Sequence, residues 1–167
     1  SIERVKQIVG QEKLDETLKN IMLLKPTNFS EQKEAFNELE KYLKKQVSLI
    51  VVDGMTILYR LDFASAREKG EKEMQRINSE LVNQIKALAG ISRKMDIPVI
   101  VTNQVYKWNE SENMVGGDIL KYWSKCLIEL TNIKGKRVAY LRKHRSLKEK
   151  SFSFTIDDKG VKKKGWM

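Results

Sequence analysis

The chain has 167 residues, of which 41% are hydrophobic and 32% are charged, and this composition predicts a single domain with a real apolar core. Its single cysteine, Cys126, excludes a disulfide framework and a cysteine-cluster zinc site. No apolar run is long enough to cross a bilayer, and the sequence shows no secretory signal. We therefore expect a cytoplasmic protein without a membrane partner.

The positive charge of the chain is concentrated near its C-terminus. The formal net charge is +10. Residues 134–167 carry 12 basic and 3 acidic side chains, whereas residues 1–133 carry 20 and 19. A localised basic face is typical of proteins that bind a polyanion such as nucleic acid. The alternative, a solubilising basic segment, stays open at this point.

The first part of the chain predicts two helical regions around one strand. Residues 2–20 have helical periodicity that Gly10 interrupts, which favours two short helices. The apolar run 21–24, closed by a Lys-Pro pair, predicts a short buried strand. Ser30 is a suitable N-cap for a helix that reaches Leu43.

The middle of the chain predicts a strand–helix–strand unit. The run 47–52, which is apolar except for Ser48 and is followed by Asp53, predicts a strand that is buried on both faces of a parallel sheet. A long helix is predicted over 71–95 and a second buried strand over 97–101. Thr102, Asn103 and Gln104 follow that strand, so they are expected beside Asp53 at the edge where ligands of α/β sheets bind.

The pattern changes after Gln104. Residues 106–115 have no strong periodicity and predict a loop, and Gly116 and Gly117 precede a short helix through Tyr122. Three further strands with short connections predict antiparallel hairpins, over residues 126–130, 138–142 and 152–156. The predicted fold is therefore one α/β domain over 1–167, parallel first and antiparallel at its C-terminal edge.

Asp53 is the candidate metal-binding residue. An apolar strand that ends in aspartate has the form of a Walker B strand, whose carboxylate binds the Mg²⁺ of a nucleotide. The alternative is an aspartate that caps the following helix. No P-loop motif, G-x-x-x-x-G-K-[ST], occurs in the 167 residues.

Several segments together resemble one family. Residues 49–60 and 97–105 resemble the core of the RecA/RadA recombinases, and residues 114–125 and 141–146 are most similar to the short archaeal paralogues of the RadB group. The resemblance covers nearly the whole chain, in order. It implies a RecA-like core in which helices flank a parallel central sheet. It also implies a protein of DNA repair and homologous recombination that binds single-stranded DNA, ATP and Mg²⁺. The implied protein partners are a second copy of the chain or a RadA-type recombinase.

In that family, the P-loop strand and helix and a catalytic glutamate precede the segment that matches Ser1 onward. We therefore expect a chain that lacks the P-loop portion, contains no catalytic residue and does not bind ATP tightly by itself. Weak or regulatory hydrolysis is expected of the intact protein. The missing strand is expected to leave a sheet edge exposed.

The resemblance assigns roles to individual residues. Asp53 matches the Walker B aspartate, and Gln104, with Asn103 beside it, matches the glutamine that links the γ-phosphate to a DNA-binding loop. Tyr59, Arg60 and Arg67 match the first DNA-facing loop. The second such loop covers 105–115. In it, Tyr106 and Trp108 are expected to stack on unpaired bases and Lys107 to contact phosphates, together with Lys121 after the Gly116-Gly117 hinge. The alternative is that Trp108 packs on its own domain.

A basic cluster forms the last candidate site. Arg142, Lys143, His144 and Arg145 match a place from which cations reach the nucleotide of a neighbouring subunit. On a strand, Arg142 and His144 would share one face. The alternative is a solvated basic edge strand. For the whole chain, the competing hypothesis is a binding module without nucleotide chemistry, which uses only its basic face.

Overall fold

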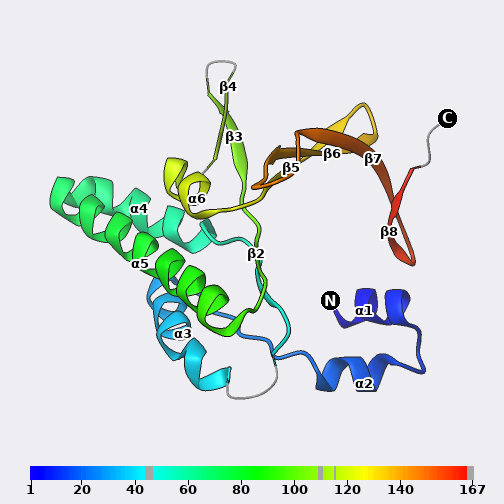
Figure 1. The fold of residues 1–167 in the computed structure, drawn as a ribbon. Coiled ribbons are helices and arrows are strands. Elements are labelled where there is room, and N and C mark those ends of the chain that lie inside the picture. The colour runs from blue at the N-terminus through cyan, green and yellow to red at the C-terminus, as the bar shows by residue number, and fades with distance from the viewer. Residues whose placement is uncertain (44–46, 109–110, 115, 165–167) are drawn as a thin grey trace. The chain divides into compact units, whose positions relative to one another are not determined.

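A computed structural model describes residues 1–43, 47–108, 111–114 and 116–164. The chain forms two compact units. The central unit is Leu24–Trp123, and the terminal unit combines Ser1–Leu23 with the described residues from Ser124 onward. Figure 1 shows the elements of both units, and each unit is described by itself.

The central unit contains the predicted strand–helix–strand arrangement. Its strands β1 (Ile50–Val52) and β2 (Val99–Val101) pair in parallel, with Val51 opposite Ile100. The long helix between them, α5 (Glu71–Met95), has the predicted bounds. The other elements of the unit are α3 (Phe29–Tyr42), α4 (Ile57–Lys69), β3 (Val105–Trp108), β4 (Ser111–Met114) and α6 (Gly117–Trp123).

The core of the central unit lies between its helices and one face of the parallel sheet. The apolar stripe of α5 is buried against α3, α4 and the residues that follow β1, and Figure 1 shows α4 and α5 side by side. Ile50 is 9% exposed, whereas Val51 and Ile100, on the opposite face, are 55% and 52% exposed. The prediction of strands buried on both faces is therefore wrong, because the helices of this unit cover one face.

Two predictions for the central unit need correction. Residues 57–69, which include the expected DNA-facing loop, form helix α4, and Gly70, with φ 103°, separates it from α5. The expected loop 106–115 is largely an antiparallel hairpin of β3 and β4, in which Val105 pairs with Met114. Residues 109, 110 and 115 lie outside the described part of the chain.

The terminal unit consists of two short helices and an antiparallel sheet. Gly10, with φ 83°, ends α1 (Ile2–Val9) as the sequence predicts, and α2 (Leu14–Lys19) follows. The four strands pair in the order β5 (Leu127–Ile133), β6 (Lys136–Lys143), β7 (Lys150–Asp157) and β8 (Gly160–Lys163). The guanidinium of Arg4 donates to the carbonyl oxygens of Asp157, at 2.6 Å, and Asp158, at 3.4 Å. These bonds connect α1 to the β7–β8 turn.

Two N-terminal predictions are wrong. Residues 21–24 are exposed and form no strand, because none of the described strands pairs with them. Helix α3 is capped by Asn28 rather than by Ser30: the Asn28 side chain accepts from the Glu31 N–H at 2.9 Å. The α/β class and both predicted kinds of sheet are confirmed, with the antiparallel strands in a sheet of their own.

Candidate functional site

The carboxyl ends of β1 and β2 bring Asp53 and Thr102 together. The Thr102 hydroxyl donates to Oδ1 of Asp53 at 2.6 Å and accepts from the Gly54 N–H at 2.8 Å. The Met55 N–H donates to the Thr102 carbonyl at 3.1 Å. One threonine therefore orients the aspartate and also holds the turn behind it.

Asn103 and Gln104, the two residues after Thr102, are bonded to the start of helix α4. The Thr56 hydroxyl donates to Oδ1 of Asn103, and Nη1 of Arg60 donates to Oε1 of Gln104 at 3.2 Å. Thr56 and Arg60 are four residues apart, so they lie on the same side of the helix start. The segment Thr102–Gln104, here called the tip segment, is thus attached residue by residue to the chain that follows Asp53.

Glycine at position 54 permits this arrangement. Gly54 has φ 80°, a left-handed conformation that costs other residues free energy. A Cβ at this position would lie 2.3 Å from Cδ1 of Ile57. The tight turn from β1 into α4 therefore depends on the absence of a side chain directly after Asp53.

Two buried glutamine side chains support the turn between β1 and α4. Nε2 of Gln32 donates to the Met55 carbonyl at 3.2 Å and to Oε1 of Gln84 at 2.7 Å. Both glutamines are buried, at 5% and 2% exposure. Sequence reasoning missed this pair, because its members lie 52 positions apart on different helices.

The structure gives Tyr59 a packing role rather than the predicted DNA-facing one. Its side chain is 7% exposed and stacks on Phe63, with ring centroids 5.5 Å apart. Its hydroxyl donates to Oδ1 of Asn78 at 2.7 Å. Burial raises the pKa of Tyr59. Arg60 and Arg67, in contrast, are exposed on α4.

The turn between α4 and α5 carries cations that the sequence reading did not single out. A depression of about 480 Å³ at this turn is lined by Lys69, Lys72 and Arg76, together with Glu73, Gln75 and Ser79. Arg76 is paired with Glu73 at 2.8 Å. Arg67 lies on the last turn of α4, and residues 67–76 together carry four basic and three acidic side chains, so the turn has a net charge of only +1. The signal in the sequence was the density of Lys and Arg around Gly70.

The expected stacking residues lie on the first strand of the hairpin. Tyr106, Lys107 and Trp108 belong to β3, and their side chains are outside the described part of the structure. Lys121 is on α6, which packs against β4. The backbone therefore places this group on the segment that directly follows Gln104, and Figure 1 shows the hairpin standing out from the helices of the central unit.

In the terminal unit, Arg142 is held by two neighbours on the antiparallel sheet. Its Nε donates to Oε2 of Glu129 at 2.5 Å, and its guanidinium carbon lies 4.6 Å from the centre of the Tyr140 ring. The hydrogen bond to Glu129 raises the pKa of Arg142. This guanidinium is therefore oriented from within the sheet.

His144 serves the turn that follows β6. Its Nδ1 accepts from the backbone N–H groups of Ser146 and Leu147, both at 3.0 Å. Because β6 ends at Lys143, the predicted common strand face of Arg142 and His144 does not form. Arg145 follows in the same exposed turn. The four basic residues are adjacent, and Arg142 and His144 have local structural partners.

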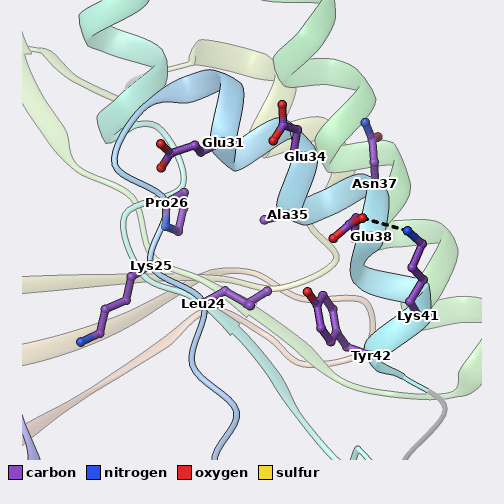
Figure 2. Close-up of a pocket in the computed structure, with 10 residues that line it drawn as sticks. All are labelled: Leu24, Lys25, Pro26, Glu31, Glu34, Ala35, Asn37, Glu38, Lys41 and Tyr42. Carbon is purple, nitrogen blue, oxygen red and sulfur yellow. Dashed lines mark hydrogen bonds and ion pairs between the residues drawn. The ribbon is translucent and has the colours of Figure 1, made fainter.

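A groove beside α3 was not predicted. It measures about 600 Å³, and Figure 2 shows the ten residues that line it. Leu24 and Pro26, on the extended segment before α3, face Ala35 and Tyr42 of the helix. Glu31, Glu34 and Glu38 give its rim an acidic character, which Lys25 and Lys41 partly balance.

The residues around Asp53 fit a nucleotide-bound magnesium ion in part. Within the described residues, Oδ2 of Asp53 makes no hydrogen bond, and the tip segment adds hydroxyl and amide oxygens, which are hard donors of the kind that Mg²⁺ prefers. No cluster of three or more His, Cys, Asp or Glu with metal-binding geometry occurs among those residues. The Asp53 carboxylate therefore fits one coordination position of a magnesium ion whose other ligands come mainly from nucleotide phosphates.

Comparison with known proteins identifies the family. The sequence profile of Rad51 matches residues 2–164. The chain belongs to the Rad51 family. It is 38% identical to the DNA repair and recombination protein RadB of Methanobrevibacter smithii, over 96% of this chain and 70% of that protein. RadB proteins of Methanococcus maripaludis and Methanocaldococcus jannaschii are 36% and 34% identical over 96% of this chain, and over 72% and 74% of their own lengths.

The predicted resemblance is confirmed. The chain is a RadB-type member of the Rad51 family, with a RecA-like α/β fold. Over the described residues, none of the helices has the length and apolar character needed to cross a membrane.

Proposed function

We propose that this chain acts in DNA repair and recombination by binding single-stranded DNA on the surface that surrounds the tip segment. The surface consists of the start of α4 and the β3–β4 hairpin, and it extends along α4 to the lysine and arginine side chains of the α4–α5 turn. The observation that carries the proposal is the attachment of the tip segment: Asp53, Thr102 and the Arg60–Gln104 bond form one continuous chain of contacts. That chain ends one residue before the hairpin whose first strand holds Tyr106, Lys107 and Trp108.

The nucleotide belongs to the same proposal. Asp53 would share a Mg²⁺ with ATP phosphates, and Thr102 would keep its carboxylate oriented. The ion would neutralise phosphate charge. Asn103 and Gln104 would report the state of the phosphates to the hairpin. Because the P-loop amides and lysine are not among the 167 residues, tight ATP binding and catalysis are assigned to the intact protein, in which hydrolysis is weak or regulatory.

Replacement of the hairpin aromatics tests the DNA-binding proposal. Base stacking on one aromatic side chain is worth about 1–3 kcal/mol, so the Tyr106→Ala/Trp108→Ala chain should bind a labelled oligothymidine at least tenfold more weakly in fluorescence anisotropy. Phe152→Ala, which removes an exposed aromatic ring of β7, is the matched control and should bind like wild type. Equal affinities for all three proteins would refute the proposed surface.

The alternative is a binding module without nucleotide chemistry, and the basic excess of residues 134–167 favours it. It predicts that DNA binding depends mainly on Arg142, Lys143 and Arg145 and is indifferent to ATP even in the intact protein. If these residues instead contact the nucleotide of a neighbouring subunit, as the resemblance implies, DNA binding by the intact protein should change when ATP is added.

Self-association is the second part of the proposal. We assign it to the groove beside α3, because a small apolar part, formed by Leu24, Pro26, Ala35 and Tyr42, with acidic residues around it suits an apolar side chain flanked by cations, and the chain itself is strongly basic. Ala35→Arg, which fills the groove, should lower the sedimentation coefficient of any oligomer. If a RadA-type recombinase is the occupant instead, the variant will lose that complex only. A cytoplasmic location accords with these partners.

A further inference from the structure

We propose that Arg60 is a positioning residue for Gln104, and that the phosphate of bound single-stranded DNA competes with Gln104 for the Arg60 guanidinium. In the absence of DNA, Arg60 holds the glutamine amide; when DNA binds, the guanidinium turns to a phosphate and releases it. The inference rests on the proposed DNA-binding function, to which it adds a specific route between DNA and the tip segment.

The start of α4 fixes Arg60 in the position that this role needs. The Arg60 N–H donates to the Thr56 carbonyl at 3.0 Å, which is an early hydrogen bond of the helix. Thr56 is 1% exposed and is itself bonded to Asn103. The tip segment is therefore anchored by a buried contact at Thr56, and Arg60 is directed at the next residue along it.

The two contacts differ in how easily they can be exchanged. The bond between the buried Thr56 and the half-buried Asn103 is partly shielded from water, whereas Arg60 and Gln104 are both exposed. An amide oxygen is a neutral acceptor, and a charged acceptor such as phosphate forms a shorter and stronger bond with guanidinium, often through two N–H groups. A phosphate that approaches α4 can therefore displace Gln104 without disturbing the anchor.

The release of Gln104 would increase the freedom of the backbone at the base of the β3–β4 hairpin. Gln104 directly precedes Val105, the first residue of β3, which is paired with Met114 of β4. The hydrogen bond from Arg60 holds Gln104, the residue directly before the Val105–Met114 pair. Loss of this bond therefore frees the base of the hairpin to adjust to the DNA. The same residue is the one proposed to sense the nucleotide, so the competition would connect the two ligands.

A double-mutant cycle on DNA affinity tests the competition. The variants are Arg60→Ala, Gln104→Ala and the double variant, titrated with labelled oligothymidine. If Gln104 occupies the guanidinium, Gln104→Ala should bind DNA more tightly, by about fivefold for one net hydrogen bond, but only where Arg60 is present. In the Arg60→Ala background, Gln104→Ala should have no effect. A Gln104→Ala chain that binds DNA equally or more weakly in the presence of Arg60 overturns the proposal.

The side-chain amide of Gln104 gives a readout without any affinity measurement. In the ¹H–¹⁵N spectrum of the free chain, its signal, assigned by its loss in Gln104→Ala, should move in Arg60→Ala and stay in place in the matched control Arg67→Ala. Addition of DNA to the wild-type chain should move the signal toward its Arg60→Ala position. A signal that does not respond to Arg60→Ala overturns the positioning role.

The outcomes separate this inference from the function on which it rests. If the chain binds DNA and the cycle is additive, the DNA-binding surface stands and the competition is wrong. If no oligonucleotide binds, the proposed function and the competition both fail.

Discussion

Thr102 joins the ends of both parallel strands with one hydroxyl group. Thr102→Val keeps the shape of the side chain but removes the donor to Asp53 and the acceptor of the Gly54 N–H. Because water can reach this exposed position, we expect a loss of about 1 kcal/mol in the free energy of unfolding, measured by urea denaturation. Thr102→Ser keeps both hydrogen bonds and should lose less. Equal stability of the valine variant and wild type would mean that the hydroxyl does not hold the turn.

At this scale the sequence predicted neighbours along the sheet edge but not contacts across the fold. Asp53 and Thr102 were expected together, because the carboxyl ends of adjacent parallel strands coincide. The Arg60–Gln104 bond was not, since it depends on a helix start that the periodicity did not reveal. The turn role of His144 was equally hidden, because it depends on where β6 ends.

The first turn of helix α3 contains the carboxylate of Glu31, which accepts two hydrogen bonds from Thr27. Oε2 of Glu31 accepts from the Thr27 N–H at 2.7 Å and from its hydroxyl at 2.8 Å. The backbone bond first, then the hydroxyl and Asn28, lower the pKa of Glu31. Because folding lowers this pKa, the cap stabilises the helix fully at pH values above the usual pKa of a glutamate. The contribution is lost as the pH falls through the lowered pKa of the folded state.

The Thr27 amide proton should report this titration in NMR spectra. Its chemical shift should change with a midpoint below that of a free glutamate side chain, and Glu31→Gln should abolish the change. Glu34→Gln, which changes a glutamate three residues further along the same helix, is the matched control and should leave the midpoint in place. A midpoint at the ordinary glutamate value would contradict the capping role.

Elements with strong periodicity were predicted well, and elements that depend on tertiary partners were not. The bounds of α5 follow from its apolar stripe, which five buried apolar residues confirm. Helix α4 was missed because its apolar residues do not form a continuous buried stripe, and only Tyr59 and Ala66 are buried. The run 21–24 has the composition of a strand, but a strand needs a neighbour to satisfy its backbone groups, and no described strand supplies one.

The distribution of charge separates the two functional hypotheses at the scale of the molecule. In the structure, Arg142 is paired with Glu129 and His144 is bonded to its own turn. Because the proposed DNA surface lies on α4 and the β3–β4 hairpin, we expect the variant with Gln at 142, 143 and 145 to keep most of its affinity for oligothymidine, with its salt dependence nearly unchanged. Screening at physiological ionic strength limits long-range attraction from these charges to about 8 Å.

The binding-module hypothesis predicts a different titration for this triple variant. If the three cations contact phosphates, the slope of log affinity against log salt should fall by about 2, from about 0.7 for each contact. A chain with Gln at the exposed positions 13, 19 and 86 has the same net charge and serves as the control.

The family could be recognised from the sequence because several motifs occur in the right order over nearly the whole chain, and the match over residues 2–164 confirms it. Which surface meets DNA could not be derived in the same way. That property depends on which basic side chains are committed to partners, and such pairing is a matter of tertiary geometry.

The most direct test of the account is to map the DNA contact by hydrogen exchange of the whole chain with and without an oligothymidine. The account predicts slower amide exchange in the β3–β4 hairpin and at the α4–α5 turn, with little change over residues 136–150. Protection confined to residues 136–150 would contradict it and would assign DNA binding to the basic strands of the terminal unit.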